Sequence, residues 1–175
     1  MNKGISLSSG KWFYFLGADD SLKDETTLES IAIELQSNFD VVSGNIQYLF
    51  TNSDSRQIKK SNGIFSSKWS KKLWIKSTVH HQATFYRREL FKESQYNTDY
   101  KILADYEFNL RLFKKKKRVK IIPNIIALCG TQGISKNYNW SLYKEEIKFK
   151  TKLSSKLLWP LFFKIALLKF LFKKI

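Results

Sequence analysis

The chain is poor in cysteine, and its apolar runs are short. Its 175 residues include one cysteine, Cys129, which excludes a disulfide framework and a cysteine-rich zinc site and favours a reducing compartment. The N-terminus, MNKGISLSSG, lacks the apolar core of a secretory signal. The C-terminal apolar stretch is interrupted by Lys164 and Lys169, and is too short and too charged to be assigned as a transmembrane span.

Acidic residues are scarce in the C-terminal third. Residues 1–113 carry 15 Lys/Arg and 13 Asp/Glu, whereas residues 114–175 carry 16 Lys/Arg and two Asp/Glu, so most of the net charge of +16 lies there. Such a block predicts a polyanionic partner, either anionic lipid or nucleic acid; a compositional bias towards lysine is the alternative. Nucleic acid is not expected, because the aromatic residues follow strand and helix spacing and therefore belong to the core.

Strand and helix patterns alternate along the chain. With 43% hydrophobic and 15% aromatic residues, the chain is long and apolar enough to form a globular core. The alternation indicates an α/β layer structure. The predicted strands are Lys11–Leu16, one or two strands around Ser43-Gly44, and the segments VKIIP and IIALC, which Pro123 separates; the predicted helices are Asp24–Ser37, about Ala104–Lys117, and the segment that runs to the C-terminus.

Three carboxylates stand where chemistry is expected. Asp19 and Asp20 directly follow the aromatic strand, and open α/β sheets bind ligands at the carboxyl ends of their strands. Carboxylates there hold Mg²⁺ or Mn²⁺, which in turn holds phosphate; a solvated turn is the alternative. Asp105 falls at the predicted start of a helix, where the dipole stabilises the anion. It could accept a proton from a hydroxyl nucleophile, or it could simply cap the helix.

Two further segments carry weaker signals. Adjacent histidines in the extended segment His80–Gln82 point opposite ways, so a structural or substrate-contacting role is favoured over a shared metal ion. The loop Gly130–Ser135 could let backbone N–H groups approach phosphate, but it lacks the lysine and the spacing of a P-loop.

Taken in order, four segments resemble family-2 glycosyltransferases with the GT-A fold. They are MNKGISLSSGKWFYFLGADDSL, HHQATFYRRELF, TDYKILADYEFNLRLF and CGTQGIS. The resemblance covers about residues 1–140. It implies a GT-A-like α/β domain, with a mixed sheet flanked by helices. It also implies transfer of a sugar from a nucleotide-sugar donor to a glycan or lipid-linked acceptor in cell-surface polysaccharide synthesis, with inversion at the anomeric carbon.

The resemblance assigns roles to individual residues. Asp19 matches the metal-binding aspartate of the family's Asp-x-Asp motif, with Asp20 beside it, whereas Gly17 stands in place of the first aspartate. Mn²⁺ or Mg²⁺ is the implied cofactor, and Asp105 is the implied catalytic base. The other implied contacts are Asn2, Gly4 and Asp19 with the donor, His81, Gln82 and Arg87 with the acceptor, and Gly133 and Ser135 near the diphosphate.

Two departures from a whole enzyme of this family are expected, the first from the resemblance and the second from the charge and apolar pattern of the C-terminus. The family's segments that bind nucleobase and ribose have no match, so residues 1–140 are expected to form an N-terminally truncated domain, and activity of this chain alone is left open. Residues 141–175 are expected to form a basic, apolar helical extension. Its residues 152–175 are predicted to adsorb to an anionic membrane, with the protein cytoplasmic and peripheral to the inner face of the plasma membrane; packing on the domain or on a partner is the alternative. A non-catalytic basic module that binds anionic membrane or a partner protein is the second function class.

Overall fold

The computed structural model describes residues 1–49, 62–131 and 137–173. Its sheet and helices alternate as the sequence predicts. The strands are β1 (Trp12–Tyr14), β2 (Ser21–Leu22), β3 (Val41–Leu49), β4 (Ile64–Phe65), β5 (Thr84–Arg87) and β6 (Val119–Gly130). The helices are α1 (Asn2–Leu7), α2 (Thr27–Leu35), α4 (Arg88–Glu93), α5 (Ala104–Lys114), α6 (Trp140–Leu153) and α7 (Trp159–Lys173), with short 3₁₀ turns η1 (Lys71–Trp74), η2 (His81–Ala83) and η4 (Lys156–Leu158).

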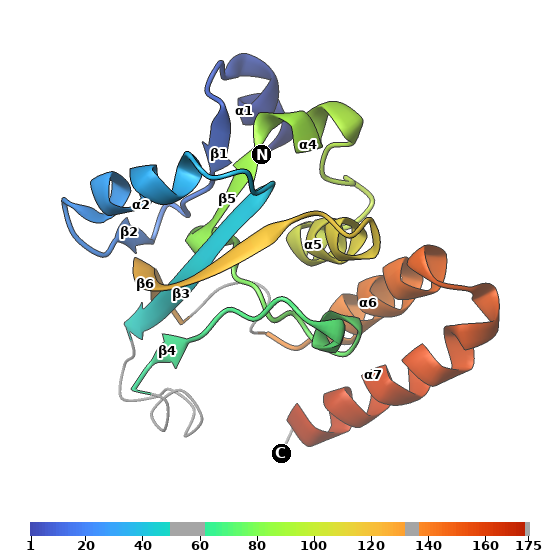
Figure 1. The fold of residues 1–175 in the computed structure, drawn as a ribbon. Coiled ribbons are helices and arrows are strands. Elements are labelled where there is room, and N and C mark those ends of the chain that lie inside the picture. The colour runs from blue at the N-terminus through green and yellow to red at the C-terminus, as the bar shows by residue number, and fades with distance from the viewer. Residues whose placement is uncertain (50–61, 132–136, 174–175) are drawn as a thin grey trace.

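One mixed sheet forms the centre of the molecule. Its strand order is β1-β5-β3-β6-β2, with β4 paired to β3. The long strands β3 and β6 run parallel, and the other pairs are antiparallel. Figure 1 shows α2 on one side of this sheet and α5 on the other, with α6 and α7 beyond α5. The predicted α/β sheet flanked by helices is therefore confirmed.

The two faces of the sheet bury different apolar sets because neighbouring strand residues point to opposite faces. Val42 and Phe85 pack with Ile31 of α2. Their neighbours Val41 and Tyr86 pack on the opposite face in a second cluster. That second cluster also holds Ile5 of α1, Phe13 of β1, Leu90 and Phe91 of α4, and Phe108 of α5. Strand β1, which precedes the turn with Asp19 and Asp20, is therefore held by core contacts.

Strand β6 is continuous where the sequence predicts two strands separated by Pro123. The register between β3 and β6 shifts on either side of Asn45, and the Asn45 side-chain amide donates to the carbonyl oxygen of Pro123 at 2.8 Å. A bulge tolerates proline because no ladder hydrogen bond is required there. Gly44 allows the close approach, since an added Cβ would lie 2.7 Å from the Asn124 carbonyl oxygen.

The C-terminal helices α6 and α7 pack onto the domain beside α5 and η1. Phe162 and Ala166 of α7 are buried in a cluster with residues of α5, α6 and η1. An ion cluster lies beside them: Glu146 of α6 accepts from Lys150 and Lys169, and both lysines donate to the Ile75 carbonyl oxygen. This packing agrees with the alternative prediction, in which the C-terminal extension packs on the domain. The boundary at residue 140 stays a prediction, because α6 shares its cluster with α5.

The outward face of α7 and the turn before it is apolar and exposed. Leu157 is 88% exposed and Phe172 is 75% exposed. The other large exposed side chains here are Leu158, Trp159, Leu161, Leu167, Leu168 and Leu171. In the described part of the chain, no helix has the length and apolar character needed to cross a membrane. Because α7 is apolar on its packed face and its outward face alike, the helical-wheel pattern of its sequence is weak.

Candidate active site

Asp20, in the turn between strands β1 and β2, joins three segments. Its Oδ2 accepts from Gln82 Nε2 at 2.6 Å, and its Oδ1 accepts from the backbone N–H of Gly130 at 3.2 Å. The hydroxyl of Tyr14 donates to the Gln82 carbonyl oxygen at 2.9 Å. Burial, reinforced by the negative potentials of Cys129 and Asp20, raises the pKa of Tyr14, so its phenol stays protonated and donates. Asp20 and Gln82 are thus fixed relative to β1 and β6.

Asp19 lies beside this junction with its carboxylate uncommitted. One oxygen lies 3.3 Å from where a Cβ on Gly130 would stand. Among the residues that the structure describes, none donates a hydrogen bond to it, and Gln82 Oε1 is buried nearby in the same junction without a donor. A carboxylate and an amide oxygen are ligands that hard divalent cations accept. Over the same described residues, no group of three or more His, Cys, Asp and Glu side chains could hold a metal ion.

Gly17 makes room for the Asp20 carboxylate. A Cβ at residue 17 would lie 2.4 Å from Asp20 Oδ2 and 3.2 Å from Asp19 Oδ1. No real Cβ contact is that short, so a larger residue at this position would displace a side chain that Gln82 and Gly130 hold. The first aspartate of the predicted Asp-x-Asp motif is therefore absent at a position where a side chain would displace Asp20.

Asp105 lies in the first turn of α5 and pairs with His81. The distance from His81 Nδ1 to Asp105 Oδ2 is 3.1 Å, and the two side chains are 28% and 25% exposed. Burial opposes ionisation of Asp105. The hydrogen bond and positive charge of His81 and the backbone N–H of Tyr106 outweigh it, so the pKa of the carboxyl is lowered. An ionised, partly exposed carboxylate at this position can accept a proton.

The turn η2 connects the two acidic positions. Its first residue, His81, contacts Asp105, and the next residue, Gln82, contacts Asp20. The end of β1, the start of α5 and the end of β6 therefore meet around one short segment. The predicted site residues Asp20 and Asp105, which lie far apart in the sequence, are thus linked through neighbouring residues of one turn. Their predicted roles, and those of Asp19, His81 and Gln82, stay predictions.

Other predicted site residues have structural contacts of their own. The Asn2 side chain exchanges hydrogen bonds with the backbone of Tyr96, at 2.8 and 3.1 Å. Arg87, at the opposite end of β5 from η2, donates to the carbonyl oxygens of Phe39 and Ser37. Gly4 is exposed in α1. The structure does not join Asn2, Gly4 or Arg87 to the carboxylates, and their ligand contacts stay predictions. Gly133 and Ser135 lie outside the described residues.

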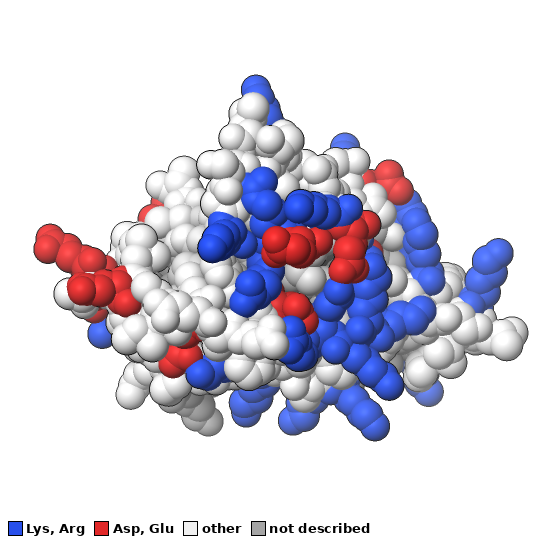
Figure 2. Space-filling model, turned by 45° about the horizontal axis from the view of Figure 1, so that its top comes forward, with Lys and Arg blue, Asp and Glu red and all other residues white. Residues whose placement is uncertain are grey.

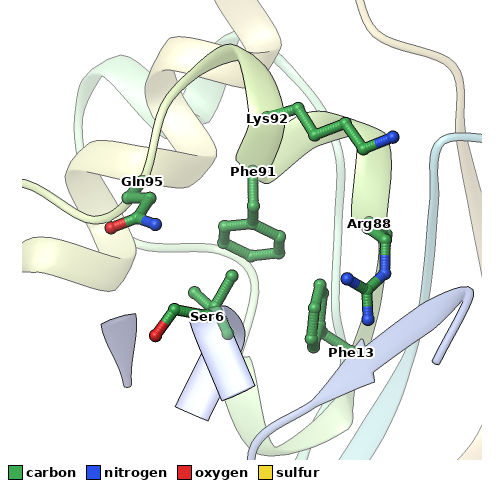
Figure 3. A pocket seen from close by; sticks show the side chains of 7 residues that line it. Ser6, Phe13, Arg88, Phe91, Lys92 and Gln95 are labelled. Carbon is green, nitrogen blue, oxygen red and sulfur yellow. The ribbon is translucent and has the colours of Figure 1, made fainter. Parts of the chain in front are cut away.

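Two shallow cavities lie near α1. The first, of about 330 Å³, lies between α1, β1 and α4 and is lined by Ile5, Ser6, Phe13, Arg88, Phe91, Lys92 and Gln95. Figure 3 shows the Arg88 guanidinium beside the Phe13 ring, with Lys92 extending outward. The second, of about 420 Å³, includes Asn2 and Ala104, the neighbour of Asp105. Neither cavity is lined by Asp19, Asp20 or Asp105 themselves.

The sequence of this chain matches known proteins. The sequence model of Glycosyl transferase family 2 matches residues 1–95, more than half of the chain. The chain belongs to glycosyl transferase family 2. The PGL/p-HBAD biosynthesis glycosyltransferases of Mycobacterium bovis (strain BCG / Pasteur 1173P2) and Mycobacterium tuberculosis (strain ATCC 25177 / H37Ra) are each 31% identical to it over 171 residues. These matches cover 91% of this chain and 63% of each relative, so the chain spans less than two thirds of its relatives.

Solved structures of S. aureus TarS share the family-2 chain's fold. TarS 1–349 in complex with UDP has a TM-score of 0.58 at 14% identity, covering 94% of this chain and 47% of TarS 1–349. The complex with UDP-GlcNAc has the same TM-score and identity, covering 98% of this chain and 51% of that one. At this identity the likeness concerns the fold alone, and it confirms the predicted GT-A-like architecture.

Sequence reasoning missed the contacts that tie this family-2 site together. It assigned Gln82 to the acceptor and paired neither Gln82 with Asp20 nor His81 with Asp105. Tyr14 was counted only as part of an apolar strand. The available signal was the sequence HHQ before a strand, because consecutive polar side chains in a turn point to different partners.

Proposed function

We propose that this chain supplies the metal and acceptor part of a site that transfers a sugar from a nucleotide-sugar to a glycan or lipid-linked acceptor. The observation that carries the proposal is η2, which links Asp20, in the turn between β1 and β2, to Asp105 on α5. Membership of family 2 supports it. So do the names of the mycobacterial relatives, which are glycosyltransferases of PGL/p-HBAD biosynthesis, and the TarS complex with UDP-GlcNAc.

Asp105 acts as the base in this reaction. The acceptor hydroxyl loses its proton to a carboxylate oxygen of Asp105, and the hydroxyl oxygen forms a bond to the anomeric carbon. The bond from that carbon to the diphosphate breaks, and its electron pair leaves with the nucleoside diphosphate. Attack opposite to the departing group inverts the anomeric centre, so one carboxylate suffices and no covalent intermediate is required.

Asp19 and Gln82 Oε1 are the oxygen atoms that suit a Mn²⁺ or Mg²⁺ ion, with Asp20 beside them. Such ions are commonly held by one or two carboxylates together with substrate phosphates. A divalent ion bound there would neutralise charge on the leaving diphosphate. Asp20, whose two oxygens already accept hydrogen bonds, orients Gln82.

Calorimetry tests the donor side of the proposal. The chain, completed with the nucleobase- and ribose-binding segment of a family-2 relative, is titrated with UDP, GDP and dTDP, with and without Mn²⁺. At least one nucleotide should bind only with the metal, and Asp19→Asn should weaken that binding several-fold or more because a charged ligand is lost. The exposed Asp99 supplies the matched control Asp99→Asn. Metal-dependent binding of equal strength in Asp19→Asn and in the control would contradict the assignment.

The second proposal is peripheral association with an anionic membrane, which places the protein on the cytoplasmic side at the inner face of the plasma membrane. The exposed apolar face of α7 supports it, since Leu161 and Leu168 lie there with Lys164 between them. Figure 2 shows further Lys and Arg side chains gathered on the side of α5 and α6, with acidic ones at the α2 end and also among the basic ones. Near a membrane each lysine contributes on the order of 1 kcal/mol towards anionic lipid, and apolar burial adds a term that salt does not screen.

Vesicle co-sedimentation tests the membrane proposal. The chain should bind vesicles that contain phosphatidylserine, and part of that binding should persist at high salt. Leu161→Glu combined with Leu168→Glu should remove the salt-resistant part, whereas Ile33→Glu, at an exposed apolar position on α2, should leave it. Unchanged binding by the α7 variant would show that another surface makes the contact.

A further inference from the structure

His81 is the described side chain that contacts Asp105 by a hydrogen bond between side chains. The carboxylate is ionised and can only accept, so the proton of the 3.1 Å bond lies on His81 Nδ1. Asp105 begins its helix without a capping side chain in front of it: the residue at the N-cap is Leu103. The orientation of the carboxylate is thus determined by η2 and by the Tyr106 N–H.

The imidazole of His81 is held from behind. Its ring stacks on the ring of His80, with centroids 5.6 Å apart and planes at 11°. His80 in turn packs edge-to-face against Phe65 of β4 and Tyr48 of β3, at 5.6 and 6.1 Å. The His80 backbone carbonyl accepts from the Thr84 hydroxyl at 2.7 Å. A row of rings from the sheet therefore fixes the rotamer of His81, and side chains held this way position reacting groups within a fraction of an ångström.

We propose that His81 is a positioning residue that holds the Asp105 carboxylate in the orientation needed to accept the acceptor's proton. The inference rests on the proposed sugar transfer, with Asp105 as its base. His81 Nδ1–H occupies Oδ2 of Asp105, which leaves the other carboxylate oxygen available for the hydroxyl. His81 itself gains and loses no proton in the step. The same hydrogen bond could instead serve only to stabilise the contact between η2 and α5. The test must therefore separate an effect on the orientation of the Asp105 carboxylate from an effect on the stability of the fold.

The tautomer of His81 tests the pairing without any assay of activity. The chain has two histidines, so two-bond ¹H–¹⁵N spectra of the labelled protein resolve both imidazoles, and His80→Gln identifies the signals of His81. At pH 8 the wild type should show His81 protonated on Nδ1, and Asp105→Ala should shift it to the Nε2–H form that free imidazole prefers. An Nε2–H tautomer in the wild type, or a tautomer unaffected by Asp105→Ala, would overturn the proposal.

Kinetics of sugar transfer test the role. Asn places an amide N–H where Nδ1–H stands, so His81→Asn should keep kcat within a few-fold, whereas His81→Leu should lower kcat by about 10–100-fold with the donor KM unchanged, as expected for a misplaced base. Melting temperatures of both variants report any loss of fold. Full kcat in His81→Leu alongside an inactive Asp105→Asn would overturn the positioning role alone. Full kcat in Asp105→Asn would instead overturn the proposed function, and the tautomer experiment would still decide the pairing.

Discussion

Lys150 of α6 carries a buried charge whose energetic cost depends on pH. Its side chain is 2% exposed, and its ammonium donates to Glu146 and to the Ile75 carbonyl oxygen. Burial, opposed by Glu146 and reinforced by the charge of Lys169, lowers the pKa of Lys150 from 10.5 to about 8. Because the folded pKa lies below the unfolded one, the unfolded chain binds more protons between these values. Stability should therefore rise with pH from about 8 to 10.5, and the gain is lost as pH falls through 8.

The size of this change in the free energy of unfolding depends on how much of the pH range between the folded and unfolded pKa values is measured. Between pH 7 and pH 9.5 the gain spans about 1.5 pH units above the folded pKa, which corresponds to about 2 kcal/mol. Urea unfolding of the wild type and of Lys150→Met at both pH values measures it, since groups common to both proteins cancel in the difference. Both values lie below the pI of about 9.8. The wild type should gain about 2 kcal/mol more than the variant, and equal gains would refute the reasoning.

Two further predictions concern the candidate site. Gly17→Ala puts a Cβ 2.4 Å from Asp20 Oδ2, so it should break the bond to Gln82 and weaken metal-dependent nucleotide binding several-fold in calorimetry. Gly10→Ala, whose Cβ has an ordinary 3.4 Å neighbour, should bind as the wild type does. Equal binding by both variants would argue against the role of Gly17 in leaving room for the Asp20 carboxylate. Because folding lowers the pKa of Asp105, the stability from its pairing is present above the ordinary value of 3.8 and is lost as pH falls through the folded value. The melting temperature should therefore fall more between pH 6 and pH 3 in the wild type than in Asp105→Asn, and parallel curves would contradict the pairing.

The sequence predicts the elements well where one period dominates. The spacing of Leu103, Tyr106, Leu110 and Phe113 places α5, which begins at Ala104 as expected and ends three residues early, at Lys114. The sequence-based prediction is wrong at β6, because Pro123 indicates the end of a strand. In the structure the Asn45 side chain and a register shift let the strand continue. Helix α1 was not predicted at all. Its six residues are too few to show a period, and its place depends on packing of Ile5 against distant residues.

The candidate site is predicted in part for a similar reason. Residue types and order identify Asp19 and Asp105, because a carboxylate at a strand end or a helix start has a local physical meaning. The links between them depend on partners more than 20 positions away in sequence: Gln82 with Asp20, and His81 with Asp105. Nothing local in the sequence encodes those pairings. Arg87 differs from these residues. The family resemblance implies an acceptor contact for it, whereas the fold places its guanidinium against backbone carbonyls and the Trp12 ring.

Transfer of sugar by the Asp105→Asn variant tests the central claim most directly. The chain, completed with the nucleobase- and ribose-binding segment of a family-2 relative, is incubated with an acceptor and a nucleotide-sugar that binds in the presence of Mn²⁺. The values of kcat and the donor KM are compared for the wild type, Asp105→Asn and the exposed control Asp99→Asn. Loss of a general base should lower kcat by about 10²–10⁴-fold in Asp105→Asn, with the donor KM and the control unchanged. Retention of most of the wild-type kcat by Asp105→Asn would contradict the claim that this carboxylate accepts the proton.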